Sequence, residues 1–232
     1  MTGRIRKNKA AGVLAGVTAL LCGWLAVACS GEQGVAGTGS VLIESATIID
    51  GSGRAGFPGD LRIRDGRIQA IGELAALPGE DRIDATGLVL APGFIDTHSH
   101  ADGDIFEHPD ALAAVSQGIT TVVVGQDGGS PFPLAEFAAR IDNTGTAINF
   151  ASYVGHNTIR QEIMGMDFRR TATADEVAAM RELLLQEYAA GAIGLATGLE
   201  YDPGIYSDTA EVLTLAQAIA DRGGRYISHM RS

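Results

Sequence analysis

The part of the chain after Gly93 alternates apolar runs with amphipathic segments, and this alternation constrains the fold more than any other feature. Five runs have the composition of buried strands, namely FIDTH, ITTVVVG, AINFASYVG, AIGLATG and RYISHM. Segments with helical periodicity separate them. Strands joined through helices pair in parallel, because each crossover helix returns the chain to the same end of the sheet. The sequence therefore predicts a parallel α/β architecture.

Two of the predicted helices carry clear boundary signals. Thr173 and Glu176 have the spacing of a capping box, in which side chain and backbone cap each other at a helix start. A Gly-Gly pair follows the helix predicted in SDTAEVLTLAQAIADRGG and marks its end. The apolar stripes of these helices are expected to pack against the sheet.

Residues 41–92 differ from the rest, because they contain short alternating strands and tight turns and no helix of useful length. In LRIRDGRIQAIG, apolar residues alternate on both sides of an Asp-Gly pair, which is typical of a hairpin turn. We expect this region to form a small β-domain.

The first 28 residues read as a secretory signal peptide, because four basic residues precede an apolar run that ends in LAVA. Cys29 follows as in a bacterial lipobox, so we expect lipidation of Cys29 and a flexible tether over residues 29–40. The alternatives are an uncleaved membrane anchor or ordinary cleavage near Ala28. The expected location is the periplasm or cell surface of a bacterium, with the membrane reached through the lipid.

The net charge of the chain is −11, and loss of the four basic residues in the signal peptide would make it −15. A chain so acidic is not expected to bind nucleic acid. The two cysteines lie in the signal and at its end, so the mature protein has no pair for a disulfide.

Polar residues gather at the predicted strand ends. His98 and His100 lie one residue apart on a strand-like run, so both should project to the same side. At or just beyond the ends of other strands lie Asp127, His156, Glu200 and His229. A doubly wound sheet would fit the periodicity equally well, but this placement favours a (β/α)₈ barrel, which gathers its chemistry at the C-terminal ends of its strands.

Four of these residues could bind one metal centre. His98, His100 and His229 offer nitrogen and Asp127 offers oxygen, a set that suits Zn²⁺ and would tolerate Mn²⁺ or Fe²⁺. Taken singly, Asp127 could be a turn residue and His229 a hydrogen-bonded core histidine.

The motifs APGFIDTHSHAD, QGITTVVVGQDGGS, VGHNTIR, GAIGLATGLEYDPGIYS and GGRYISHMRS make residues 41–232 similar to the amidohydrolase superfamily, and specifically to N-acyl-D-amino-acid deacylases. The resemblance implies a metal-bearing (β/α)₈ barrel, here ending after about strand five (residues 93–232). It also implies a small β-sandwich, formed in part by residues 41–92.

The same resemblance implies that His98 and His100 are metal ligands from the first strand and His229 from the fifth. At the second-strand position the family has a metal-binding cysteine, whereas this chain has Asp127. Other relatives bridge two metals with a carboxylated lysine, but this chain has no lysine after Lys9. A carboxylate can bridge two ions. Asp127, or with less support Glu200, is then the expected bridge, and the centre would hold one or two ions.

By resemblance, the expected reaction is hydrolysis of a linear amide in an N-acyl-D-amino acid by a metal-activated water. Tyr201 and Arg231 are expected to contact the substrate carboxylate, His156 the substrate or the developing oxyanion, and Glu200 the surroundings of the site. The family's general-base aspartate and a further histidine would lie beyond Ser232, so we expect residues 1–232 alone to be inactive.

Two alternatives remain open from the sequence. The substrate could be another amide, such as a hydantoin-like ring or a D-peptide, or the chain could be a lipoprotein that binds a ligand without turnover. Metal content separates the last case, because a catalytic site should hold one or two tightly bound ions. The acyl preference and the oligomeric state do not follow from the sequence.

Overall fold

The computed structural model describes residues 39–232. The signal peptide, Cys29 and most of the expected tether lie outside these residues. Ser40 already belongs to the first strand. Within the described range, none of the helices combines the length and the apolar composition needed to cross a membrane.

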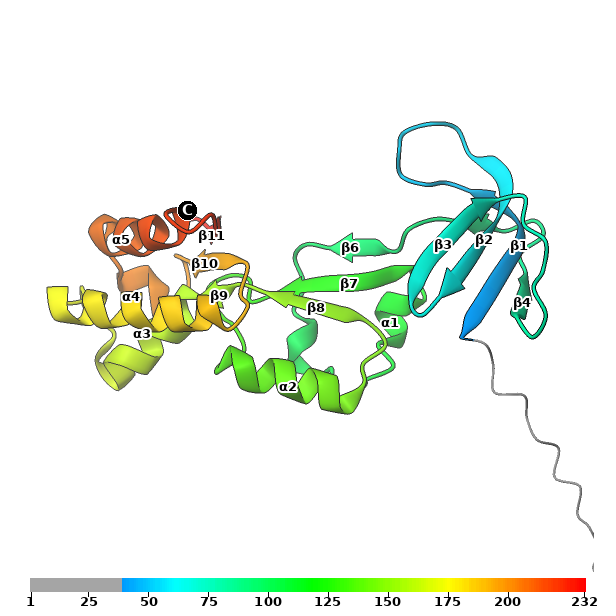
Figure 1. The fold of residues 1–232 in the computed structure, drawn as a ribbon. Coiled ribbons are helices and arrows are strands. Elements are labelled where there is room, and N and C mark those ends of the chain that lie inside the picture. The colour runs from blue at the N-terminus through cyan, green and yellow to red at the C-terminus, as the bar shows by residue number, and fades with distance from the viewer. Residues whose placement is uncertain (1–38) are drawn as a thin grey trace, which may run out of the picture.

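The N-terminal region is a single mixed sheet (Figure 1). Its strands are β1 (Ser40–Ile48), β2 (Phe57–Arg64), β3 (Arg67–Gly72), β4 (Asp81–Asp84) and β5 (Val89–Leu90). The order is β3-β2-β1-β4, and β5 also pairs with β1. A sandwich needs a second sheet facing the first. The described residues provide only one sheet here, so the structure does not show the β-sandwich that the resemblance implies.

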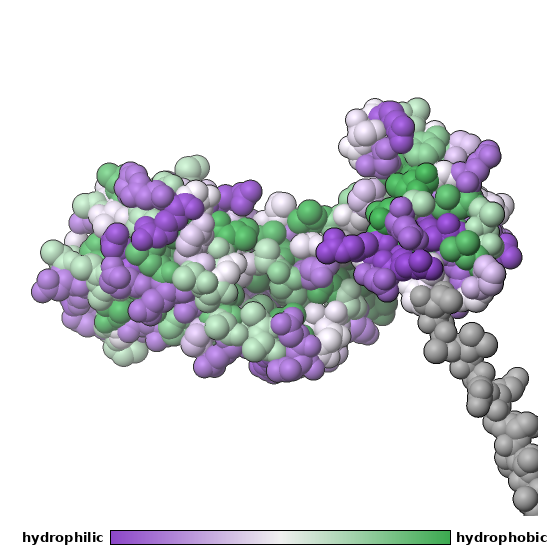
Figure 2. All heavy atoms as spheres, viewed as in Figure 1, coloured by the Kyte–Doolittle hydropathy of each residue, from purple (hydrophilic) through white to green (hydrophobic). Residues whose placement is uncertain are grey.

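The predicted hairpin is confirmed. β2 and β3 pair antiparallel around Asp65 and Gly66, whose φ angles are 51° and 70°. Two successive left-handed residues are the signature of a tight hairpin turn, which explains the Asp-Gly pair. Figure 2 shows apolar patches among the polar surface of this sheet, and Ile68, Ile71, Ile83 and Val89 are exposed on it.

The remaining strands are parallel and follow one another in space in chain order. They are β6 (Phe94–Asp96), β7 (Ile119–Val124), β8 (Asn149–Ser152), β9 (Val154–Gly155), β10 (Gly194–Gly198) and β11 (Arg225–His229). β6, β7 and β8 form one ladder, and β9, β10 and β11 the other. β8 and β9 are two parts of one run, joined at Tyr153. Chain order without reversal is expected of a barrel arc and not of a doubly wound sheet.

Five α-helices accompany these strands: α1 (Leu112–Val115), α2 (Leu134–Thr144), α3 (His156–Met164), α4 (Ala174–Ala189) and α5 (Thr209–Ala220). The predicted capping box at the start of α4 is present in both directions. α3 was not among the helices predicted from the sequence. The helix begins directly after β9 and buries Ile159.

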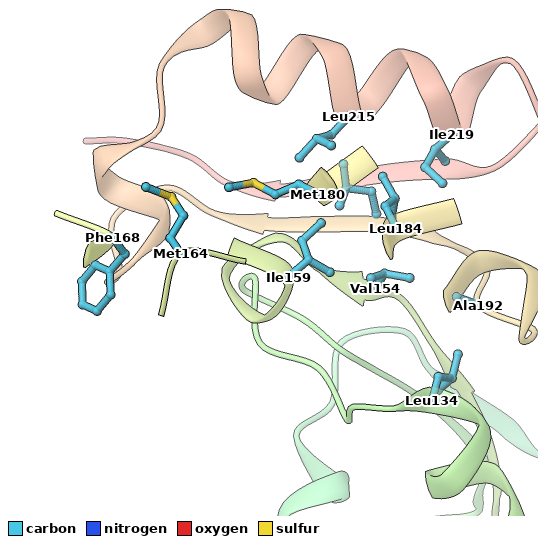
Figure 3. Packing of buried hydrophobic residues seen from close by; sticks show 11 residues of the cluster. Leu134, Val154, Ile159, Met164, Phe168, Met180, Leu184, Ala192, Leu215 and Ile219 are labelled. Atoms are coloured by element: carbon cyan, nitrogen blue, oxygen red, sulfur yellow. The ribbon is translucent and has the colours of Figure 1, made fainter. Parts of the chain in front are cut away.

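The largest apolar core lies between α3, α4 and α5 and the β9–β10 pair (Figure 3). Met180, Leu184, Leu215 and Ile219 are fully buried there, as the helical stripes predict. This core fixes the helices against β10 and β11, whose C-terminal ends carry Glu200 and His229.

In the N-terminal sheet, a buried ion pair joins β2 to the turn before β4. Arg62 Nε and Nη2 donate to the two carboxylate oxygens of Glu80 at 2.6 and 2.9 Å. Ser40 Oγ and the backbone N–H of Leu77 also donate to this carboxylate. The hydrogen bonds from Arg62, helped by Ser40 and Leu77 against the opposing effect of burial, lower the pKa of Glu80 to about 2.

We predict that Glu80 makes stability dependent on acid pH. Its ordinary pKa of 4.5 falls to about 2 on folding, so the unfolded chain binds the proton more tightly. The stabilisation is therefore complete above pH 4.5 and is lost as the pH falls towards 2. Thermal unfolding measured from pH 2 to 7 should show a lower Tm and a flatter acid limb for Glu80→Gln. The exposed Glu73→Gln is the control, and an equal change in that variant would contradict the prediction.

Candidate metal centre

Three of the four predicted ligands come together. Nε2 of His98 and Nε2 of His100 lie 3.2 and 3.3 Å from Oδ2 of Asp127. One ligand atom from each of the three residues can be chosen so that all lie within 4.8 Å of one another. The sequence placed both histidines on a strand. β6 ends at Asp96, so they lie in the segment that follows the strand.

His229, at the end of β11, faces the other carboxylate oxygen. Its Nδ1 is 3.3 Å from Oδ1 of Asp127, and its Nε2 is 3.5 Å from Oε2 of Glu200. The hydroxyl of Tyr201 lies 3.2 Å from Nδ1 of the same ring. Asp127 therefore stands between the histidine pair from the β6 end and the histidine from the β11 end.

The carboxylates of this cluster are held in their charged form. Partial burial alone would raise the pKa of Asp127, but hydrogen bonds and charge from His98 and His229 outweigh it and lower the pKa. Hydrogen bonds from Ser232, followed by His229, lower the pKa of Glu200. Near neutral pH both carboxylates can therefore act as oxygen ligands for a cation.

The spacing of these atoms fits a metal ion. Nitrogen and oxygen ligands bind Zn²⁺ at about 2.0–2.2 Å, so neighbouring ligands of a tetrahedral ion lie about 3.4 Å apart. The separations of 3.2 and 3.3 Å between Asp127 Oδ2 and the two imidazoles are close to that value. Imidazole with carboxylate suits Zn²⁺, and also Mn²⁺ or Fe²⁺.

The backbone around Asp127 explains how the carboxylate reaches this place. Asp127 has a φ of 55°, and Gly125 and Gly128 on either side of it have φ angles of 77° and 83°. These left-handed residues turn the chain sharply at the end of β7. On β10, a Cβ on Gly198 would lie 1.9 Å from the carbonyl oxygen of Asp127. The close approach of β10 to Asp127 thus requires glycine.

An open hollow of about 460 Å³ borders the cluster. Its lining includes His100, Asp102, Asp127, Asn157, Thr158 and Tyr201. Burial raises the pKa of Asp102, and its backbone hydrogen bond and the charge of His100 oppose this only in part. The hollow gives a small molecule access to the carboxylate and to the tyrosine hydroxyl.

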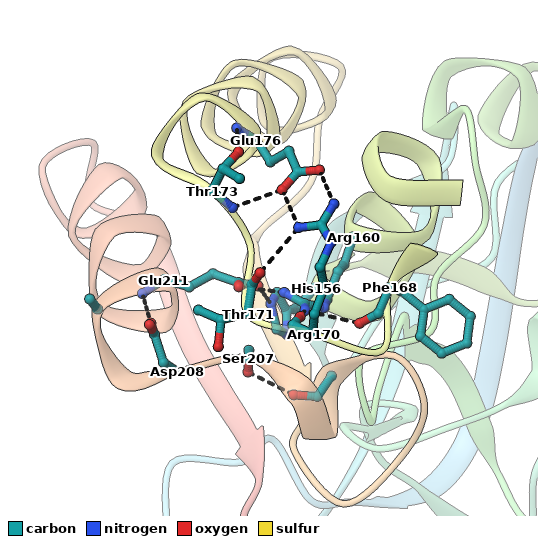
Figure 4. Close-up of polar contacts among 12 residues, drawn as sticks. His156, Arg160, Phe168, Arg170, Thr171, Thr173, Glu176, Ser207, Asp208 and Glu211 are labelled. Carbon is teal, nitrogen blue, oxygen red and sulfur yellow. Dashed lines mark hydrogen bonds and ion pairs between the residues drawn. The ribbon is translucent and has the colours of Figure 1, made fainter. Parts of the chain in front are cut away.

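The expectation that His156 meets a substrate needs correction. Its ring is fully buried at the start of α3, and Nε2 lies 2.7 Å from Oε1 of Glu211 on α5 (Figure 4). The buried guanidinium of Arg160 pairs with the other oxygen of Glu211 and with backbone carbonyls of Phe168 and Arg170. His156 therefore ties α3 to α5 and does not line the hollow.

Arg231 has its Nη2 2.6 Å from the carbonyl oxygen and 3.2 Å from the hydroxyl of Ser207, so part of its guanidinium is bound to that loop. Its contact with a substrate carboxylate stays a prediction, as do the roles of Tyr201 and Glu200.

Gln126 is a residue of the site that the sequence analysis did not identify. Its side chain is buried, and Nε2 donates to the carbonyl oxygens of Thr97 and Val123 at 3.0 and 3.3 Å. The amide thus connects the histidine segment to the end of β7. A polar residue directly before the candidate ligand Asp127 was the available signal.

The fold and the site together define a parallel α/β protein with a candidate metal centre at the C-terminal ends of its strands. The chain belongs to the amidohydrolase family, whose family model matches residues 81–229.

Two curated relatives come from Alcaligenes xylosoxydans xylosoxydans. A D-aminoacylase is 39% identical over 214 residues, with 82% of this chain and 44% of the relative covered. An N-acyl-D-aspartate deacylase is 41% identical over 214 residues, with 82% and 43% covered. The chain thus spans less than half the length of these relatives.

Two solved structures of similar deacylases also match this chain. The N-acyl-D-glutamate deacylase of Bordetella bronchiseptica, in complex with zinc and a phosphonate inhibitor, matches with a TM-score of 0.78 at 40% identity. The match covers 83% of this chain and 45% of that one. A D-aminoacylase crystal structure matches with a TM-score of 0.75 at 36% identity and the same coverage.

We predict that Gly198→Ala disrupts the centre. The new methyl group would meet the backbone of Asp127, so either β10 or the carboxylate must move. The expected cost is about 1–3 kcal/mol of stability, together with weaker metal uptake. Gly129→Ala is the matched control, because a Cβ there would lie 4.0 Å from its nearest neighbour. Melting curves and metal analysis of both variants check this, and equal behaviour would contradict it.

Proposed function

We propose that the protein is a metal-dependent amidohydrolase that removes the acyl group from N-acyl-D-amino acids. The observation that carries the proposal is the placement of His98, His100 and His229 around the two oxygens of Asp127. The relatives add the substrate class, because those named above are a D-aminoacylase and deacylases of N-acyl-D-aspartate and N-acyl-D-glutamate.

We propose Zn²⁺ as the metal, in one or two ions. The B. bronchiseptica structure contains zinc, and another matching structure is described by its binuclear metal centre. When bound, such an ion would lower the pKa of a water molecule and polarise the amide carbonyl. His98 and His100, which face Oδ2 of Asp127, would be ligands of the ion. His229, which faces Oδ1, would be a further ligand.

The described residues also suggest how the substrate is oriented. Tyr201 is an exposed residue, and its hydroxyl beside His229 can donate a hydrogen bond to a substrate oxygen. Arg231 can pair with the free carboxylate of an N-acyl amino acid, because a guanidinium binds a carboxylate through two parallel hydrogen bonds. Glu200 would hold His229 and the backbone at Ser232 in place.

In this proposal, the arc from β6 to β11 is part of a (β/α)₈ barrel, and the N-terminal sheet is part of a β-sandwich. The edge strands β6 and β11 support this, since Phe94, Ile95 and Tyr226 are exposed along them. Parallel sheets are normally buried on both faces, so exposed apolar residues on these strands indicate that further structure covers them.

The protein is further proposed to be an exported lipoprotein anchored through Cys29. The support is the sequence alone, with its basic residues, apolar run and small residues before the cysteine. Mass spectrometry of the mature N-terminus checks this. A lipid on Cys29 that is lost in Cys29→Ala is the expected result, and a free N-terminus elsewhere would contradict it.

We predict that metal binding depends on Asp127. Asp127→Asn should lower zinc affinity at least tenfold, because the amide keeps the size of the carboxylate but loses its charge. The exposed Asp104→Asn, four residues after His100, is the control. Metal content measured by mass spectrometry and zinc titration checks this. The absence of bound metal in the unmodified protein would favour a ligand-binding lipoprotein without turnover.

The substrate class has its own test. Because residues 1–232 alone are expected to be inactive, the assay uses the full-length protein. N-acetyl-D-amino acids and their L-enantiomers would be assayed side by side for release of the free amino acid, together with a hydantoin ring and a D-dipeptide. The expected result is faster turnover of the linear D-compounds, lost in Asp127→Asn and retained in Asp104→Asn. Faster turnover of the cyclic amide or the dipeptide would contradict the deacylase assignment.

A further inference from the structure

The first turn of α3 contacts helix α5 and the two segments that follow β7 and β10, which carry residues of the candidate metal centre. Its consecutive residues His156, Asn157 and Thr158 face different parts of the fold. The histidine binds Glu211 on α5, as described above. The next two residues contact the segments that follow β7 and β10, which carry Asp127 and Tyr201.

Thr158 holds the segment after β7 at two points. Its backbone N–H donates to the carbonyl oxygen of Gly128 at 3.1 Å, and its Oγ1 accepts a hydrogen bond from the N–H of Ser130 at 2.9 Å. Ser130 Oγ in turn accepts from the N–H of Gly155 at 2.9 Å. The residue after Asp127 is therefore fixed directly to the helix.

Asn157 holds the segment after β10. Its side chain is buried, and Nδ2 donates to the carbonyl oxygen of Gly198 at 3.1 Å. The carbonyl oxygens of Tyr201 and Asp202 lie at 3.4 and 3.5 Å from the same nitrogen. One amide thus gathers the carbonyl groups of the loop that carries the tyrosine hydroxyl.

The first turn of α3 is closely packed against both loops. A Cβ on Gly128 or on Gly204 would lie 2.3 Å from Oδ1 of Asn157. A Cβ on Gly155 would lie 2.3 Å from the carbonyl oxygen of Gly128. A shift of the first turn of α3 is therefore passed on to both loops.

Resting on the proposed function, we propose that Asn157 and Thr158 are positioning residues that set Asp127 against Tyr201 at the metal centre. Asp127 has a left-handed conformation, which costs energy for a residue with a Cβ although Asp tolerates it better than most, so neighbouring contacts help to fix its place. The hydroxyl of Thr158 supplies such a contact from a side chain, and so can be removed without altering the backbone.

The test compares Thr158→Val with Thr158→Ser. Valine keeps the shape of threonine but cannot accept the hydrogen bond from Ser130, whereas serine can. Titration with Co²⁺ reports affinity and, through the visible absorption bands, ligand geometry. We expect Thr158→Val to bind Co²⁺ about fivefold more weakly with altered bands, because a lost hydrogen bond typically has an effect of this size. Thr158→Ser should match the unmodified chain.

Asn157→Asp provides a second route with nearly the same side-chain shape. A carboxylate in place of the amide nitrogen would repel the carbonyl oxygens of Gly198 and Tyr201, so the cobalt bands should change here as well. Circular dichroism and melting in the absence of metal show that each compared variant is folded.

Unchanged cobalt affinity and bands in folded Thr158→Val and Asn157→Asp would overturn the positioning role, even if both variants melt earlier. Cobalt binding that survives the double change His98→Asn and His100→Asn is a different outcome. It would contradict the metal centre of the proposed function and, with it, this inference. The two failures are thus separable.

Discussion

The candidate site depends on the carboxylate of Asp127, which faces imidazoles from the first and the last of the parallel strands, β6 and β11. Oδ2 of Asp127 meets His98 and His100, and Oδ1 meets His229, with all three separations between 3.2 and 3.3 Å. His98 and His229 form hydrogen bonds with this carboxylate. The same donor atoms could coordinate an ion at these spacings. A single anionic residue thus connects side chains that are 131 residues apart in the chain.

The presence of aspartate at this position affects the chemistry of the centre. The resemblance described above places a thiolate there, which is a soft ligand that favours zinc, whereas a carboxylate is harder and also accommodates Mn²⁺ or Fe²⁺. The orientation of Asp127, with one oxygen on each side, fits a bridge between two ions. Since the chain has no lysine after Lys9, a carboxylated lysine is not available for that role within it.

Local patterns in the sequence predicted much of the fold. The βα alternation predicted the parallel strands. The Asp-Gly pair predicted the β2–β3 hairpin, and the spacing of Thr173 and Glu176 predicted the start of α4. What failed depends on distant contacts. The motif VGHNTIR contains the start of α3, where His156 and Arg160 pair with Glu211, 55 residues beyond His156, and no local periodicity reveals that contact. His156 was assigned to the site because it follows a strand end, but the contact with Glu211 turns it into the core.

The buried group of His156, Arg160 and Glu211 also explains why the first turn of α3 can act as a fixed reference. Burial of the Glu211 carboxylate would raise its pKa, but hydrogen bonds from His156 and Arg160 outweigh this effect and lower it. Removing one partner from such a group leaves an uncompensated charge in the interior, which costs far more than an exposed ion pair. The geometry of α3 relative to α5 is therefore strongly specified. Because Asn157 and Thr158 lie in the same turn as His156, the loops they hold are positioned by the buried core and not by solvent-exposed contacts.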